Sequence, residues 1–180
     1  MILVLLADGF EEIEALSPVD MLRRAGLEVK TASISGSDAL GAHGIRVQCD
    51  MEADEVDISS VEAVIFPGGM PGATNLDASP FTDRVISAVN ERGGIIAAIC
   101  AAPLVLGRRG LLRGRCATCY PGFEDELMGA RVLDRGVVTD GNIVTARGMG
   151  VALEFSEELI KLLCGEDKAR SISQAICKAL

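Results

Sequence analysis

The chain has 180 residues, enough for one domain with a sizeable hydrophobic core. Hydrophobic residues make up 49% of it and charged residues 24%, which is typical of a soluble globular protein and excludes a disordered chain. The net charge of -9 and the near absence of aromatic side chains, with one Tyr and no Trp, argue against nucleic-acid binding, because phosphates are repelled and bases lack stacking partners.

The N-terminal segment and the cysteines indicate the compartment. The apolar run at residues 1–7 is short, lacks a basic stretch before it and turns acidic at once, so it makes a poor signal peptide. No later apolar run approaches the roughly 20 residues that span a bilayer, so we expect no membrane attachment. We therefore expect a cytoplasmic protein whose six cysteines are free thiols.

Apolar runs and helical periodicities alternate along the whole chain. In chain order they predict a strand at 1–7, a helix at 11–25, a strand at 27–34, a glycine-rich hairpin at 36–49, a strand at 61–66, a helix at 80–91, a strand at 94–99, a helix from 102–107, strands at 115–119, 131–133, 137–139 and 142–146, and helices at 151–162 and 169–176. This alternation indicates an α/β sandwich with a mostly parallel sheet covered on both faces. No repeat or linker interrupts it, so residues 1–180 are expected to form a single domain.

The sharpest chemical signal is a cysteine between a strand and a helix. Cys100 directly follows the apolar run at 94–99, and Pro103 stands in the first helical turn, where proline is favoured. Small residues flank the cysteine, as in the strained elbow from which a nucleophile projects. The amides of such a helix start favour a thiolate, so we expect a lowered pKa for Cys100. The alternative is a buried structural cysteine, as most free cysteines are.

Backbone amides near this cysteine can complete a site. The sequence Pro67-Gly68-Gly69 ends a strand at the edge where open α/β sheets bind ligands, and glycines there let N–H groups approach a substrate. Together with the amide of Ala101, which follows the nucleophile, the amide of Gly69 would form an oxyanion hole. A plain tight turn at residues 67–69 is the alternative.

Acidic residues open the first predicted helix. Glu11 and Glu12 are expected to complement the helix dipole. Glu14 lies one turn further in, where it can point into the same crevice as Cys100. A carboxyl group buried beside a thiolate stays protonated, because two adjacent anions are costly, and it would donate a hydrogen bond to sulfur.

Signals for metals and cofactors are weak. Cys116 and Cys119 have the spacing of a redox pair or half a zinc site, but residues three apart on a strand point to opposite faces, and no second such pair exists. Gly148 and Gly150 lack the third glycine of a dinucleotide fingerprint. Arg147, just before them, is expected to help shape the crevice. The remaining cysteines are predicted to be packing residues: Cys49, Cys164 and Cys177.

Four segments resemble the ThiJ/PfpI superfamily in order and spacing, and they span nearly the whole chain: ADGFEEIEALSPVDMLRRAG, IFPGGMPGATNL, GGIIAAICAAP and TARGMG. The resemblance implies a flavodoxin-like three-layer sandwich, usually a homodimer, that needs no cofactor. It also implies that Cys100 is the reactive cysteine, that Glu14 is its protonated partner, and that Gly69 and Ala101 supply the oxyanion-binding amides.

The chain departs from the family pattern at two histidines. Protease-like members have a histidine directly after the cysteine, where this chain has Ala101, so peptide hydrolysis by a Cys–His pair is not expected. Deglycase-type members have a histidine on the strand after the elbow helix, where this chain has Tyr120. The one histidine of the sequence, His43, lies in the predicted hairpin, where we expect a surface role, although the hairpin could carry it to a neighbouring subunit.

The first interpretation is therefore an enzyme acting on small reactive carbonyls such as methylglyoxal, or on their early adducts with thiols and amines. Cys100 would form a hemithioacetal whose oxyanion binds the amides of Gly69 and Ala101, and Glu14 would act as general acid and base. Tyr120 would assist, although a phenol is seldom ionised at neutral pH.

Two alternatives remain open at the level of sequence. One is a redox sensor or chaperone-like stress protein, in which Cys100 is oxidised to a sulfinate that the Glu14 proton stabilises. The other is a cysteine hydrolase or amidase, which the missing histidine weakens.

Overall fold

Seven short strands form one central sheet in the computed structural model, which describes residues 1–178. These strands are β1 (Ile2–Leu6), β2 (Val29–Ser33), β5 (Met51–Glu52), β6 (Ala63–Phe66), β7 (Ile95–Ile99), β10 (Val137–Asp140) and β11 (Ile143–Ala146). The spatial order is β10-β11-β7-β6-β1-β2-β5, and every neighbouring pair is parallel except β10 with β11. The predicted mostly parallel sheet is thereby confirmed.

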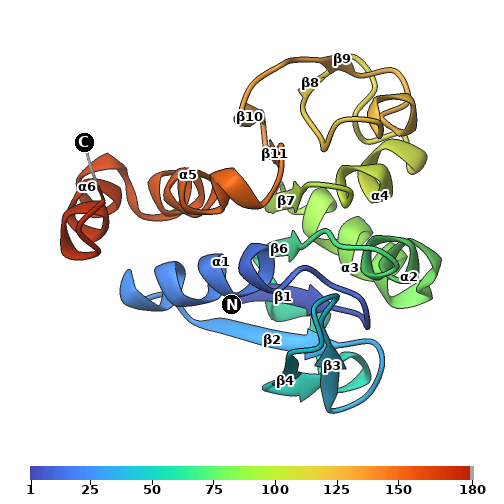
Figure 1. Ribbon diagram of the computed structural model, residues 1–180, viewed down its shortest axis with the longest axis horizontal. Coiled ribbons are helices and arrows are strands. Elements are labelled where there is room, and N and C mark those ends of the chain that lie inside the picture. The colour runs from blue at the N-terminus through green and yellow to red at the C-terminus, as the bar shows by residue number, and fades with distance from the viewer. Residues whose placement is uncertain (179–180) are drawn as a thin grey trace.

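Helices cover both faces of this sheet. They are α1 (Glu12–Arg24), α2 (Gly72–Ala78), α3 (Pro80–Glu91), α4 (Pro103–Arg108), α5 (Ala152–Cys164) and α6 (Glu166–Ala175). Figure 1 shows α2, α3 and α4 on one side of the strands and α1 and α5 on the other, with α6 beyond α5. This is the expected three-layer α/β sandwich. Among the helices of residues 1–178, none is long and apolar enough to cross a membrane.

Strand β1 shows how the sequence builds the two layers. Its five residues are all buried, and alternate side chains enter different hydrophobic clusters. Leu3 and Leu5 pack with α2, α3 and α4, whereas Ile2, Val4 and Leu6 pack with α1 and α5. A strand covered on both faces needs apolar residues at every position, which explains the unbroken run at the start of the chain.

The carboxyl ends of β1, β6, β7 and β11 meet at one edge of the sheet, because these strands are parallel neighbours. The loops that follow them contain residues 7–11, 67–71, 100–102 and 147–151. The predicted hairpin, β3 (Asp38–Leu40) with β4 (Arg46–Gln48), lies beside the first of these loops (Figure 1). The amide of Gly9 donates to the Leu40 carbonyl at 2.7 Å, and that of Ala42 donates to the Phe10 carbonyl at 2.8 Å.

Three local expectations need correction. The strand expected at 115–119 is only β8 (Cys116–Ala117), paired with β9 (Arg131–Val132), because the amide of Thr118 turns to the Thr145 hydroxyl. Helix α2 and strand β5 were not expected. The sequence GATNLDA of α2 has weak helix formers and reads as a loop, yet burial of Ala73 and Leu76 stabilises it as a helix.

Candidate active site

Cys100 forms the predicted elbow between β7 and α4. Its φ of 66° lies in the left-handed region, which costs a non-glycine residue about 1–3 kcal/mol. Hydrogen bonds on both sides hold this conformation. The Cys100 amide donates to the Ala146 carbonyl at 2.8 Å, and the Cys100 carbonyl accepts from the Tyr120 amide at 2.8 Å. The end of β11 and the segment after β8 therefore fix the direction of the sulfur.

The side chain of Glu14 reaches the sulfur of Cys100 from helix α1. Its carboxyl group is hydrogen-bonded to the thiol, and the residue is 1% exposed. The amide of Gly68 donates to Glu14 Oε2 at 2.9 Å, and the amide of Met149 also donates to the carboxyl group. The structure thus brings the two predicted residues together, with backbone donors from two further loops.

Burial dominates the protonation of this pair. Desolvation raises the pKa of Glu14 to about 7, against the opposing hydrogen bonds from Cys100 and two amides. Desolvation, followed by the charge of Glu14, raises the pKa of the Cys100 thiol to about 12. The predicted lowering of the thiol pKa is therefore wrong, because burial and the neighbouring carboxylate outweigh the amide donors. Near neutral pH the thiol therefore keeps its proton, and the carboxyl group of Glu14 is the one that gains or loses a proton.

Two backbone amides face the sulfur, those of Gly69 and Ala101, and both lower the pKa of the thiol. They are the amides predicted for an oxyanion hole. Glycine is needed here for lack of space. A Cβ at Gly68 would lie 2.6 Å from the Cβ of Cys100, and a Cβ at Gly69, whose φ is 85°, would lie 2.4 Å from the Glu11 nitrogen. The glycine pair thus lets the loop after β6 approach the cysteine.

Tyr120 lies beside the elbow, as expected from its position. It is half exposed, and its ring lies near Gly148, where an added Cβ would be 3.3 Å from the ring. The same Cβ would lie 3.9 Å from Glu14 Oε1. Arg147 forms an ion pair with Asp134 at the surface. The contribution of the 148–149 segment to the Glu14 site was missed, although the motif TARGMG had marked its neighbourhood.

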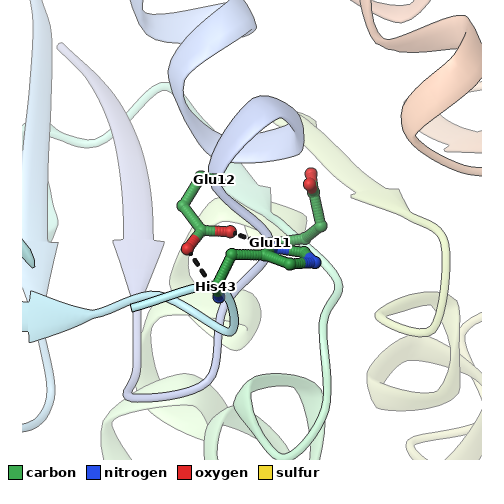
Figure 2. Close-up of side chains that lie close together, drawn as sticks. All are labelled: Glu11, Glu12 and His43. Carbon is green, nitrogen blue, oxygen red and sulfur yellow. Dashed lines mark hydrogen bonds and ion pairs between the residues drawn. The ribbon is translucent and has the colours of Figure 1, made fainter. Parts of the chain in front are cut away.

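The imidazole ring of His43 binds the carboxylate of Glu12 (Figure 2). The amide of His43 donates to Glu12 Oε1 at 2.8 Å, and its Nδ1 is 2.7 Å from Glu12 Oε2. This pairing lowers the pKa of Glu12 despite burial and raises the pKa of His43. Glu12 lies in the first turn of α1, where it was expected to complement the helix dipole, but it is 4% exposed, and its contact with His43 was not predicted. It fastens the hairpin to α1.

The donor atoms of Glu11, Glu12 and His43 lie within 4.8 Å of one another, which is close enough for a metal ion. All three are already engaged as hydrogen-bond partners. Glu11 accepts from the Glu14 amide at 2.7 Å as the helix cap, and Glu12 holds His43 (Figure 2). The three side chains are therefore explained by local structure, as a cap and a hairpin anchor.

The other cysteines lie away from this chemistry. Cys49 and Cys119 are buried, as packing residues are, and Cys116 is half-buried on β8. Cys164 and Cys177 are exposed, so the prediction that they pack in the core is wrong. Cys164 is the last residue of α5 and Cys177 follows α6, and helix ends of this kind project into solvent.

Comparison with known proteins settles the family. The model of the DJ-1/PfpI family matches residues 1–162. The chain belongs to the DJ-1/PfpI family. This confirms the resemblance to the ThiJ/PfpI superfamily and the flavodoxin-like fold.

Three relatives match along almost their whole length. The chain is 35% identical to a protein named deglycase from Pyrococcus abyssi, over 90% of this chain and 98% of that protein. It is 32% identical to a protein named glutathione-independent glyoxalase from Caenorhabditis elegans, over 99% and 96% of the two chains. The solved structure of oxidized Toxoplasma gondii DJ-1 superimposes with a TM-score of 0.95 at 35% identity, covering 99% of this chain and 98% of that one.

The contact between Glu14 and Cys100 predicts how the thiol titrates. Glu14→Gln removes the negative charge and keeps an N–H donor, so the pKa of Cys100 should fall. At an effective dielectric constant of ~20, two charges ~4 Å apart interact by ~4 kcal/mol, so alkylation of Cys100 by iodoacetamide at pH 8 should become about tenfold faster or more. Peptide mapping at several pH values would measure the rate at this cysteine alone.

Asp20→Asn is the matched control, because it removes a negative charge from α1 at an exposed residue that pairs with Arg24. It should change the rate less than about twofold. An alkylation rate in Glu14→Gln that equals or falls below that of the wild type would refute the proposed charge effect.

Proposed function

We propose that this protein is a cofactor-free cysteine enzyme that converts small α-oxoaldehydes such as methylglyoxal to 2-hydroxy acids and reverses their early adducts with thiols and amines. The observation that supports this best is the buried Cys100–Glu14 pair under the amides of Gly69 and Ala101. A nucleophile, a proton acceptor and an oxyanion site within one crevice are the parts that carbonyl addition requires. Relatives named deglycase and glutathione-independent glyoxalase support the same chemistry.

The first step is addition of Cys100 to the aldehyde carbon. The thiol is protonated at neutral pH, so it needs a base, and the Glu14 carboxylate beside it accepts the proton as the S–C bond forms. The carbonyl oxygen becomes an oxyanion that the amides of Gly69 and Ala101 stabilise. Return of the proton to this oxygen gives a hemithioacetal.

The second step moves a proton between the two oxygen-bearing carbons. The Glu14 carboxylate removes the hydrogen of the former aldehyde carbon, and the electron pair passes to the ketone as an enediolate forms. Protonation of the neighbouring carbon gives a thioester of a 2-hydroxy acid. One carbon is oxidised and the other reduced, so no external oxidant is needed. Water then cleaves the thioester and restores the Cys100 thiol. A pKa of about 7 suits Glu14 to act as both base and acid near neutral pH.

This mechanism predicts a glutathione-independent activity that depends on one cysteine. Purified protein with methylglyoxal should form lactate, measured by proton NMR. Cys100→Ser should lower the rate by about 100-fold or more, because a hydroxyl is a much weaker nucleophile than a thiol. Cys164→Ser, the same change at an exposed cysteine, should leave the rate unchanged. Lactate formation that survives in Cys100→Ser would exclude the proposed nucleophile.

Tyr120 stands at the position where the resemblance to deglycase-type proteins implies a histidine. A phenol donates a hydrogen bond but is a poor base at neutral pH, whereas general acid–base help is worth about 10²–10⁴-fold. Tyr120→His should therefore raise kcat for methylglyoxal, and Tyr120→Phe should change it little. Steady-state kinetics of the two variants would check this. Loss of activity in Tyr120→Phe would mean that the hydroxyl group is required.

We further propose that the enzyme works in the cytoplasm as a homodimer formed through α1. Apolar side chains are exposed on this face, with Ile13 48% and Ile45 55% exposed, and Leu16 and Leu153 lie beside them. All four line a hollow of about 740 Å³. Exposed apolar patches of this kind mark interaction surfaces, and a second copy would cover this one.

Sedimentation velocity tests the dimer. The molar mass derived for the wild type should be about twice the 18.9 kDa of the chain. Ile13→Asp should shift it to the monomer, because a charge would then be buried in the interface. Leu162→Asp, at an exposed leucine outside the hollow, should remain dimeric. A monomeric wild type would reject this assembly.

A further inference from the structure

A second hollow, of about 340 Å³, opens beside the reactive pair. Its walls come from the segment after β8 and from the loop after β11. The lining side chains are mainly apolar, those of Tyr120, Pro121, Met149 and Val151. Arg147 also lines it, but its guanidinium group is held by Asp134. The hollow therefore offers mainly apolar contact.

Two residues that line this hollow also contact the Cys100–Glu14 pair through their backbone amides. The amide of Tyr120 donates to the Cys100 carbonyl at 2.8 Å, and the amide of Met149 donates to the Glu14 carboxyl group. Between them lies Gly148, where an added Cβ would be 3.3 Å from the Tyr120 ring and 3.9 Å from Glu14 Oε1. Gly148 thus lines the hollow and lies next to the acid, so the hollow and the reactive pair are neighbours at this segment.

We propose that this hollow binds the apolar substituent of the substrate, so that the enzyme prefers α-oxoaldehydes with a branched-alkyl or aromatic group over methylglyoxal. This inference rests on the proposed function and names its substrate class. A carbonyl held at Cys100 places its substituent toward Tyr120 and Met149, whose ring and thioether favour apolar contact. The net charge of -9 of the chain disfavours an anionic substituent.

Glycine 150 allows the hollow to be filled without strain. Gly150 lines the hollow, its φ lies outside the left-handed region, and an added Cβ would meet no atom within 4 Å. Gly150→Leu should therefore fold normally and occupy the space. Its kcat/KM for isobutylglyoxal should fall about tenfold or more, while that for methylglyoxal should change less than about threefold.

Met149→Ser tests the apolar wall, with Met128→Ser as the matched control. The two methionines are 49% and 48% exposed, and only Met149 lines the hollow. The wild type should prefer isobutylglyoxal to methylglyoxal by about tenfold in kcat/KM. Met149→Ser should reduce this preference, and Met128→Ser should leave it unchanged.

Binding without turnover provides an independent readout. Methyl isobutyl ketone has the same substituent but no aldehyde. In protein with ¹³C-methyl-labelled methionine, it should shift the NMR signal of Met149 and not that of Met128, and the shift should disappear in Gly150→Leu.

The outcomes separate the two proposals. A wild type that turns over neither aldehyde, with the Met149 shift present, rejects the proposed function and keeps the apolar subsite. Turnover with a preference that neither Gly150→Leu nor Met149→Ser alters keeps the function and overturns the subsite. An unmoved Met149 signal at saturating ketone also overturns it.

Discussion

The left-handed backbone at Cys100 is the constraint on which the site depends. This conformation is unfavourable for cysteine but not for glycine. Hydrogen bonds to the Ala146 carbonyl and from the Tyr120 amide offset the unfavourable backbone energy. The position of the sulfur therefore depends on β11 lying in register beside β7. This conformation directs the sulfur out of the sheet toward α1, where it contacts Glu14.

Parallel pairing gathers the remaining parts at the same edge. Because β1, β6, β7 and β11 run in one direction, their loops converge from distant parts of the chain. Gly68 shows how closely they pack, since a single added methyl group would lie 2.6 Å from both the Cβ of Cys100 and Glu14 Oε2. Such packing leaves little room for water, and it is this burial that governs the chemistry of the pair.

The protonation of the pair follows from that burial. Desolvation opposes the charge of both Cys100 and Glu14, and their proximity allows only one of them to ionise readily. The carboxyl group, with a pKa of about 7, is the one that exchanges its proton near neutral pH. In the proposed mechanism Cys100 is therefore activated by its neighbour as the bond forms, in contrast to a free thiolate at a helix start.

Local patterns in the sequence determined the alternation of strands and helices, the elbow at Cys100 and the position of Glu14 in the first turn of α1. Periodicity, small residues and spacing are properties of short segments, which is why the sequence shows them. Only the tertiary structure decided the rest. Helix α2 forms through burial that its weak propensity does not reveal, and Glu12 is buried because His43 reaches it from a hairpin 31 residues away. The direction of the thiol pKa likewise depends on desolvation, which exists only once the layers have packed around the sulfur.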